Sequence, residues 1–125
     1  MKVLFIGGTG LISQAVSSKL LEEEGIELYL FNRGNNSQFI PDGAKLIIGD
    51  IRDQESSKEI LSKYQFDVVV NWVAFTTEHI KLDLEIFKAR TEQYIFISSA
   101  SAYQKPLNDY LIKESTPLKN PYWQY

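Results

Sequence analysis

The chain has 125 residues, long enough for one domain with a hydrophobic core, and its 44% hydrophobic and 23% charged residues are ordinary for a globular protein. Its formal net charge of −3 at pH 7 offers no basic surface for sequence-independent nucleic-acid binding. It has no cysteine, which excludes disulfides and thiolate metal ligands.

Two kinds of apolar segment are missing from the sequence. Only four apolar residues, Val3 to Ile6, precede the first glycines, too few for a secretory signal peptide. No stretch reaches the roughly 20 apolar residues of a membrane-spanning helix. We therefore expect a cytoplasmic protein without a membrane span. We also expect no metal site, because the single histidine, His79, has no partner at metal-ligand spacing.

The N-terminal segment MKVLFIGGTGLIS carries the strongest motif. Residues 2–6 are an apolar run without alternation, which predicts a strand buried on both faces. Glycines follow at once, and apolar residues then recur at helical spacing as far as Gly25, which predicts a helix. In this context Gly7 permits a tight turn and Gly10 lets the backbone approach a pyrophosphate, which the free N–H groups of the new helix face.

The third position of the glycine spacing is Ser13, which is small enough for the close helix–strand contact that glycine usually provides there. The alternative interpretation is an ordinary strand–helix turn that binds nothing. Because the glycines come directly after a buried strand, the pattern favours dinucleotide binding.

A second strand is predicted over residues 26–31 and a polar loop over residues 32–37. At this point a dinucleotide-binding fold meets the adenosine ribose. An acid here binds the free 2′-hydroxyl of NAD, whereas an arginine accommodates the 2′-phosphate of NADP. Asn32 and Arg33 stand in place of the acid, so the pattern favours NADP over NAD. The alternative is that Arg33 is only a solvated loop cation.

A third strand is predicted over residues 45–49 and is followed by Asp50, whose carboxylate can accept a hydrogen bond from the amino group of adenine. A turn-forming role after Gly49 is an equally good interpretation of Asp50. Asp53 is expected to cap a helix that continues to Tyr64.

A fourth strand, rich in valine, is predicted over residues 66–72. It leads into Val73 and Ala74, small residues whose backbone would line the nicotinamide side of a cleft. A helix is expected from Thr77 onward, with an apolar stripe formed by Ile80, Leu84 and Phe87. His79, in the first turn of that helix, is interpreted as structural or solvent-facing.

A fifth strand is predicted over residues 93–98 and opens into a small polar patch over residues 99–103. The carboxyl edge of an open α/β sheet is where ligands bind. Prolines interrupt the pattern after residue 104 and predict loop. Five strands alternating with helices predict a Rossmann-type α/β fold, a doubly wound parallel sheet truncated after about five strands.

Five short motifs occur in a specific order and spacing: GGTGLIS at 7–13, NRG at 32–34, GDIRD at 49–53, VVVNWVAF at 68–75 and FISSASAY at 96–103. Together they resemble the extended or atypical short-chain dehydrogenase/reductase superfamily, in its NAD-dependent epimerase/dehydratase group. The residue pattern and this resemblance give an expected cofactor-binding set of Gly7, Thr9, Gly10, Leu11, Ile12, Asn32, Arg33, Asp50, Ile51, Val73, Ala74 and Ser98.

The resemblance also implies two catalytic residues. Ser99, four residues before Tyr103, matches the residue that orients the substrate hydroxyl. Tyr125, by its placement after Asn120, Pro121 and Tyr122, matches the acid/base tyrosine, and Tyr122 is the less favoured candidate. The family follows this tyrosine four residues later with a lysine that lowers the pKa of the phenol. That lysine would fall beyond residue 125, so we expect the 125-residue chain to bind dinucleotide without turning over a substrate.

The resemblance implies that residues 1–125 are the N-terminal NAD(P)-binding Rossmann domain of an epimerase, dehydratase or reductase, without its C-terminal substrate region. The substrate would be a small molecule with a hydroxyl-bearing carbon, best matched by a nucleotide-linked sugar. Asn71 and Trp72 depart from the histidine-containing run of many extended members. The alternatives are a non-catalytic dinucleotide-sensing or RNA-associated protein, and an interaction protein that binds no nucleotide. A homodimer is compatible with each, and the acidic net charge disfavours RNA.

Overall fold

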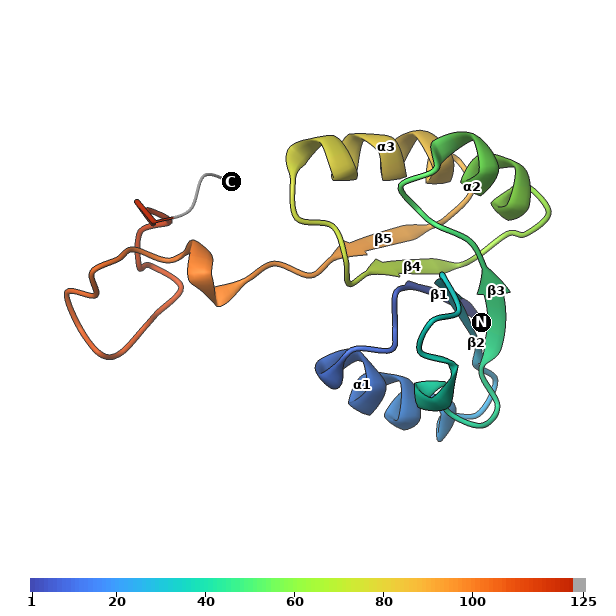
Figure 1. Cartoon of the computed structure of the whole chain (residues 1–125). Coiled ribbons are helices and arrows are strands. Elements are labelled where there is room, and N and C mark those ends of the chain that lie inside the picture. The colour runs from blue at the N-terminus through green and yellow to red at the C-terminus, as the bar shows by residue number, and fades with distance from the viewer. Residues whose placement is uncertain (123–125) are drawn as a thin grey trace.

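In a computed structural model of the chain, which describes residues 1–122, parallel strands form one sheet in the order β3-β2-β1-β4-β5 (Figure 1). The strands are β1 (Lys2–Ile6), β2 (Glu27–Asn32), β3 (Lys45–Ile48), β4 (Val68–Asn71) and β5 (Gln93–Phe96). Every neighbouring pair runs in the same direction. The predicted strands therefore exist, and the last four differ from their predicted bounds by one or two residues at one or both ends.

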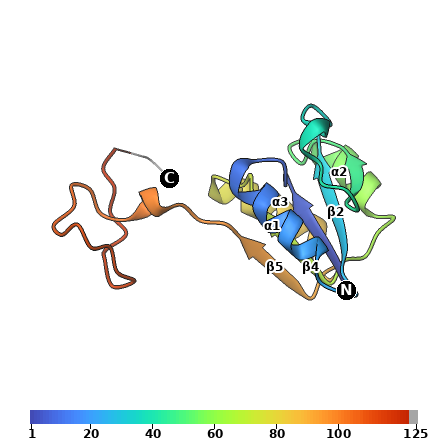
Figure 2. The same ribbon diagram turned by 90° about the horizontal axis from the view of Figure 1, so that it is seen from below.

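Helices cover both faces of this sheet. Helix α1 (Leu11–Leu21) lies on one face, and α2 (Gln54–Leu61) and α3 (Thr77–Phe87) lie on the other (Figures 1 and 2). Two 3-10 turns, η1 (Ser37–Phe39) and η2 (Ala100–Ala102), interrupt the loops. Helices on both faces of a parallel sheet make a doubly wound Rossmann-type fold, so the predicted fold class is confirmed.

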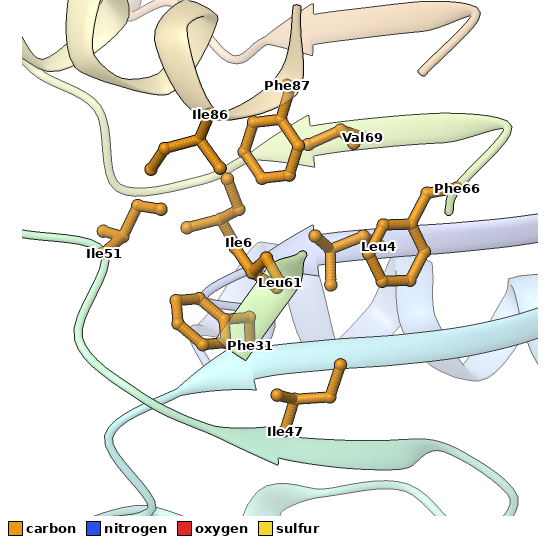
Figure 3. Packing of buried hydrophobic residues seen from close by; sticks show 10 residues of the cluster. All are labelled: Leu4, Ile6, Phe31, Ile47, Ile51, Leu61, Phe66, Val69, Ile86 and Phe87. Atoms are coloured by element: carbon orange, nitrogen blue, oxygen red, sulfur yellow. The ribbon is translucent and has the colours of Figure 1, made fainter. Parts of the chain in front are cut away.

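The core is divided between the two faces of the sheet, because side chains alternate along each strand. In β1, Leu4 and Ile6 join the larger cluster beneath α2 and α3, where Phe31, Val69 and Phe87 also pack (Figure 3). The opposite side chains of β1 join the cluster beneath α1, which contains Val3, Phe5, Leu28, Leu30 and Val70. A strand buried on both faces explains why Val3 to Ile6 form a continuous apolar run.

The residues that α1 buries most deeply are serines, while two of its apolar residues, Leu20 and Leu21, pack partly buried against the core. Ser13 and Ser17 face the sheet with 2% and 0% of their surface exposed, whereas Leu11 and Ile12 are 90% and 70% exposed. Small serines let the helix lie close to the strands, and the exposed Leu11 and Ile12 are left beside the carboxyl edge of the sheet.

In helix α3, too, a polar residue is buried where an apolar residue was expected. Leu84, expected on its apolar stripe, is half-exposed, while Asp83 is completely buried.

The expected cap of α2 is confirmed, because the Asp53 carboxylate accepts a hydrogen bond from the backbone N–H of Ser56 at 3.2 Å. That helix ends at Leu61, three residues before the predicted end, Tyr64.

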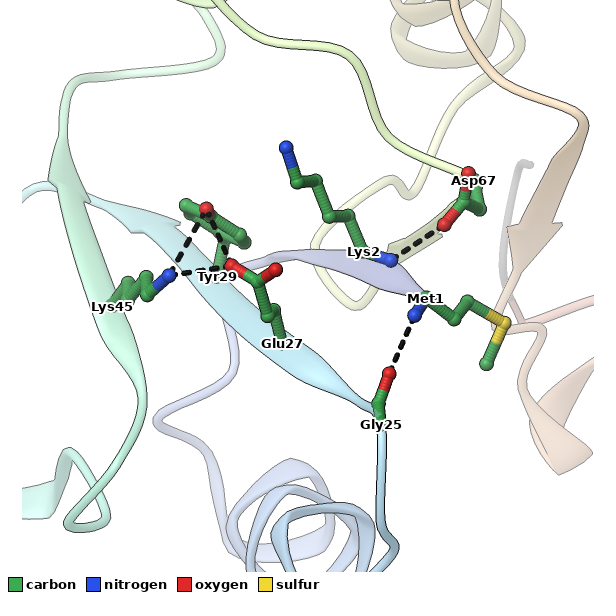
Figure 4. A network of polar contacts seen from close by, with 7 residues as sticks. All are labelled: Met1, Lys2, Gly25, Glu27, Tyr29, Lys45 and Asp67. Carbon is green, nitrogen blue, oxygen red and sulfur yellow. Dashed lines mark hydrogen bonds and ion pairs between the residues drawn. The ribbon is translucent and has the colours of Figure 1, made fainter.

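Polar contacts hold the amino-terminal end of the sheet (Figure 4). The Lys2 N–H donates to the Asp67 carboxylate at 2.6 Å, and Lys45 pairs with Glu27 at 2.5 Å. The hydrogen bond with Lys45 lowers the pKa of Glu27, and the same bond raises the pKa of Lys45. This pair is solvent-exposed, so it contributes little stability, and it lies at the end of the sheet opposite the carboxyl edge.

The segment after β5, residues 97–122, reaches away from the sheet (Figures 1 and 2). It is held together mainly by its own contacts: the Asn120 side-chain amide donates to the Ser101 carbonyl at 2.5 Å, and the Gln104 N–H donates to the Pro117 carbonyl at 2.7 Å. Among the described residues, no helix combines the length and apolar character that crossing a membrane requires.

Candidate functional site

Two adjoining cavities lie along the carboxyl edge of the sheet. The first has a volume of about 410 Å³ and lies over the ends of β2 and β3; the second has about 740 Å³ and lies over the ends of β4 and β5. Gly7, Thr9, Val73 and Phe75 line both cavities. The two cavities therefore form one groove that crosses the end of β1, and we call it the carboxyl-edge groove.

The glycine turn between β1 and α1 forms the middle of this groove. Gly7 and Gly8 have φ angles of +98° and +86°, in the left-handed region that side chains disfavour. A Cβ on Gly8 would also lie 2.7 Å from Cδ2 of Leu30. Gly7 is required for the tight turn, as its position predicts. The spacing alone does not reveal that Gly8 is even more restricted by packing.

Gly10 is free of both constraints. Its φ is −85°, and a Cβ there would meet only the Ser13 hydroxyl, at 3.5 Å. That hydroxyl accepts from the Gly10 N–H at 2.9 Å and lies 3.1 Å from the Gly10 carbonyl, to which it donates. Ser13 thus closes the turn with hydrogen bonds that a glycine there lacks. The fold itself does not require glycine at position 10.

The N-terminus of α1 lacks the capping side chain and the acidic residue that offset the positive end of the helix dipole in α2 and α3. It has no side-chain cap and no acid in its first turn. By contrast, α2 is capped by Asp53 with Glu55 in its first turn, and α3 is capped by Thr76 with Glu78. The positive end of the α1 dipole and its unpaired N–H groups therefore face the groove, which suits an external anion.

At the far end of the first cavity, Asn32 and Arg33 follow one another at the end of β2. The Asn32 side-chain oxygen accepts from the Gly34 N–H at 2.8 Å, so its Nδ2 group is directed elsewhere. That Nδ2 is buried and has no hydrogen-bond partner among the described residues. A buried donor without a partner is costly, and here it lines a cavity. Arg33 is exposed at the rim.

Asp50 and Ile51 form the opposite wall of the first cavity. Asp50 shapes the local turn, because its carboxylate accepts from the Arg52 N–H at 3.0 Å and its carbonyl accepts from the Ser57 hydroxyl at 2.7 Å. It also lines the cavity, so the turn-forming and ligand-facing interpretations of this residue are compatible. Ile51 is buried in the larger core cluster and anchors the wall.

Val73 and Ala74 leave β4 and line the second cavity. Their N–H groups donate to the side-chain oxygen of Asn71, at 2.7 and 2.8 Å, and this fixes the turn. Asn71 is completely buried, a role that the sequence pattern does not indicate. His79 has a structural contact, as interpreted: its Nδ1 accepts from the Phe75 N–H at 3.1 Å.

Ser98 and Ser99 line the second cavity after β5. The Ser99 hydroxyl caps η2 by accepting from the Ser101 N–H at 3.2 Å. Tyr125 lies outside the described residues. Every other residue of the expected cofactor-binding and catalytic sets lines one or both cavities. Within residues 1–122, no cluster of three or more histidine, cysteine or carboxylate side chains could hold a metal ion.

This geometry can be compared with known proteins. The model of the NAD-dependent epimerase/dehydratase family matches residues 3–125, nearly the whole chain. The chain belongs to this family. The resemblance carried by the five motifs is thereby confirmed. Curated protein sequences give no match.

Solved structures from the epimerase/dehydratase group share the fold at low sequence identity. A UDP-glucose 4-epimerase is 21% identical with a TM-score of 0.82, covering 97% of this chain and 42% of its own. The NAD complex of Brucella ovis UDP-glucose 4-epimerase is 22% identical with a TM-score of 0.77, covering 95% and 42%. The NAD complex of Bacillus anthracis dTDP-glucose 4,6-dehydratase is 22% identical with a TM-score of 0.73, covering 98% and 46%. The chain thus spans less than half the length of these relatives.

Proposed function

We propose that residues 1–125 form an NAD(P)-binding domain and that the dinucleotide lies along the carboxyl-edge groove. The observation that carries this proposal is the uncompensated N-terminus of α1, which opens into the middle of a groove with a cavity on either side. A dinucleotide has the matching order of parts: an anionic pyrophosphate between two nucleosides. Two solved relatives with the same fold are NAD complexes, which supports this choice.

The residues present fit the pyrophosphate and the adenosine. The absence of a side chain at Gly10, which the fold does not need, leaves space for phosphate oxygens next to the first N–H groups of α1. Exposed Leu11 would cover the ligand from the helix side. At the adenosine end, the Asp50 carboxylate would accept from the adenine amino group. The unpaired Asn32 amide and the Arg33 charge would face the ribose and its 2′-phosphate.

The nicotinamide would occupy the second cavity, against Val73, Ala74 and Ser98. Bound nicotinamide supplies hydride acceptance or donation at a carbon that bears a hydroxyl group. In a full-length protein, Ser99 would hold the substrate hydroxyl by a hydrogen bond, and Tyr125 would hold or transfer its proton. A nucleotide-linked sugar is the proposed substrate class, because relatives of this fold are UDP-sugar epimerases.

The proposal is tested by titrating the 125-residue chain with NAD⁺, NADP⁺ and ADP-ribose in a calorimeter at fixed salt. We expect one dinucleotide per chain. ADP-ribose should compete with it, because it carries the pyrophosphate and both riboses. We also expect the backbone amide signals of Leu11, Ile12 and Ser13 to move in NMR spectra on binding. A chain that binds none of the three ligands would contradict the proposal.

The cofactor preference gives a sharper prediction. We expect NADP⁺ to bind more tightly than NAD⁺, since a charge-assisted hydrogen bond contributes about 1.5–3 kcal/mol, roughly tenfold or more in affinity. Asn32→Asp keeps the oxygen that accepts from the Gly34 N–H but replaces the unpaired donor with negative charge. The ratio of NADP⁺ to NAD⁺ affinity should then fall at least about tenfold.

Asn108→Asp is the matched control for that substitution. It makes the same change of residue and net charge in the exposed segment that reaches away from the sheet, so it should leave the affinity ratio as in the parent. An affinity ratio that is the same in Asn32→Asp and in the parent would show that Asn32 does not face the 2′ position.

A further inference from the structure

Beneath the connection between β4 and α3 lies a polar cluster, formed by the buried Asn71 and Asp83 and the half-buried Arg52 and Tyr94. Asn71 and Asp83 are each 0% exposed. One Asp83 oxygen, Oδ2, accepts from the Asn71 side-chain amide and from the Tyr94 hydroxyl, the latter at 2.7 Å. Buried polar groups are stable only with partners. The cluster therefore fixes β4, β5 and α3 relative to one another.

The same cluster holds the backbone of the β4–α3 connection from two sides. Asn71 accepts from the N–H groups of Val73 and Ala74. On the other side, Nη2 of Arg52 donates to the Val73 carbonyl. Val73 lines both cavities of the carboxyl-edge groove. The position of this wall of the groove thus depends on two side chains, the buried Asn71 and the half-buried Arg52.

Arg52 does not come from the β4 side of the groove. It belongs to the connection between β3 and α2, next to Asp50, whose carboxylate accepts from the Arg52 N–H. Two strands, β2 and β1, lie between β3 and β4 in the sheet. With neighbouring strands about 4.8 Å apart, the ends of β3 and β4 are about 14 Å apart. The Arg52 side chain thus links the connection after β3 to the connection after β4, and both Arg52 and Val73 line the first cavity.

The positive charge of Arg52 also acts on Asp83. Nη1 of Arg52 and Oδ1 of Asp83 are both buried and have no hydrogen-bond partner among the described residues. Burial raises the pKa of Asp83, whereas the hydrogen bonds from Tyr94 and Asn71 and the charges of Arg52 and His79 lower it. Arg52 is thus a counter-charge for this buried carboxyl. Its loss would remove the donor to Val73 and leave Asp83 with less compensation.

We propose that Arg52 is a positioning residue that holds the β4–α3 wall of the carboxyl-edge groove at a fixed separation from the β3–α2 wall. A ligand that spans both cavities then meets both walls without first having to order them, which preserves its affinity. A mononucleotide bound by the β2 and β3 ends gains little from this link. The expected effect on affinity rests on the proposed dinucleotide binding. The effect of Arg52 on the stability of the β4–α3 connection can be measured without ligand.

The ligand-free test is amide hydrogen exchange of the 125-residue chain with Arg52→Met, which keeps a long apolar stem and removes the donors and the charge. We expect exchange at Val73, Ala74 and Phe75 to become about tenfold faster, as for a lost charge-assisted hydrogen bond. Exchange within β2 should stay as in the parent. Arg52→Lys, which keeps a charged donor, should restore part of the protection.

Arg90→Met is the matched control. Arg90, which follows the C-terminal end of α3, donates to the carbonyl of Ser62, the residue after α2, at 3.3 Å. It lines neither cavity of the groove. Its substitution removes the same charge and should leave the hydrogen-exchange rates of the Val73, Ala74 and Phe75 amides as in the parent. Parental exchange at Val73, Ala74 and Phe75 in Arg52→Met would overturn the proposal.

The functional test compares two ligands in the same variants. Arg52→Met should weaken the tighter of NAD⁺ and NADP⁺ about tenfold while changing the affinity for 5′-AMP by less than about twofold, and Arg52→Lys should recover part of the loss. Equal losses for 5′-AMP and dinucleotide would contradict a positioning role. If the parent chain binds no dinucleotide, the proposed function fails, and the hydrogen-exchange result still decides whether Arg52 positions the wall.

Discussion

Gly10→Val is expected to abolish measurable dinucleotide binding while leaving the fold intact. A valine side chain would occupy the space next to the first N–H groups of α1 and displace a pyrophosphate from them. Losing two charge-assisted hydrogen bonds of about 1.5–3 kcal/mol each would weaken binding roughly 100-fold or more. Because Gly10 has an ordinary φ of −85° and its Cβ position is open, the melting temperature should stay within about 2 °C of the parent.

Gly8→Ala, in the same turn, is expected to destabilise the fold, whereas Gly10→Val affects only binding. Its Cβ would lie 2.7 Å from the Leu30 side chain, at a φ of +86°. Left-handed strain and overpacking together should cost about 2–4 kcal/mol and lower the melting temperature by roughly 8 °C or more. Calorimetric titration and thermal unfolding of both variants separate the two roles. Parental affinity in Gly10→Val would show that no ligand phosphate lies on this turn.

The fold could be predicted because its signals are local. A short apolar run such as Val3 to Ile6 is typical of a strand buried on both faces, and glycines directly after it mark the turn into a helix. The face that α1 buries could be predicted only in part. Close approach of the helix to the sheet selects the small Ser13 and Ser17. The glycine spacing indicates this contact for Ser13, but neither the spacing nor the hydrophobic periodicity indicates it for Ser17.

The residues of the groove could be predicted for a related reason. The carboxyl ends of parallel strands meet at one edge, so residues such as Gly7, Asp50 and Val73 come together whatever the details of packing. The residues that support them could not. Asp83 reads as a polar position on a helix surface, and only the fold places it against Asn71 and Tyr94. The available signal in the sequence was the spacing of Asp83, which lies three residues after Ile80 and four before Phe87 and so falls on the apolar face of the helix.

Asn71→Ala is expected to destabilise the fold strongly. Its truncation leaves the N–H groups of Val73 and Ala74 without their acceptor and the buried Asp83 carboxyl with one hydrogen-bond donor fewer. Unsatisfied buried groups cost about 1–3 kcal/mol each, so a total of about 3–5 kcal/mol is expected. Asn36→Ala, the same substitution at an exposed loop position, should stay within about 0.5 kcal/mol in urea denaturation. Equal stabilities of the two variants would contradict the role given to Asn71.

Asn71→Asp should make the stability depend on pH in a stated direction. The new carboxyl would lie against Asp83, whose pKa burial already raises, and two buried carboxyls in contact cannot both ionise cheaply. The folded variant then holds a proton that the unfolded chain releases near its ordinary pKa of about 4. Since the folded state binds more protons, stability falls as pH rises from about 4 toward the raised pKa of the pair. At low pH the protonated carboxyl can still donate to Asp83 and accept from Val73 and Ala74, much as the amide does. The urea midpoint of this variant should therefore lie closer to that of the parent at pH 5 than at pH 8, and a gap that is the same at both values would show that the two side chains do not share a buried site.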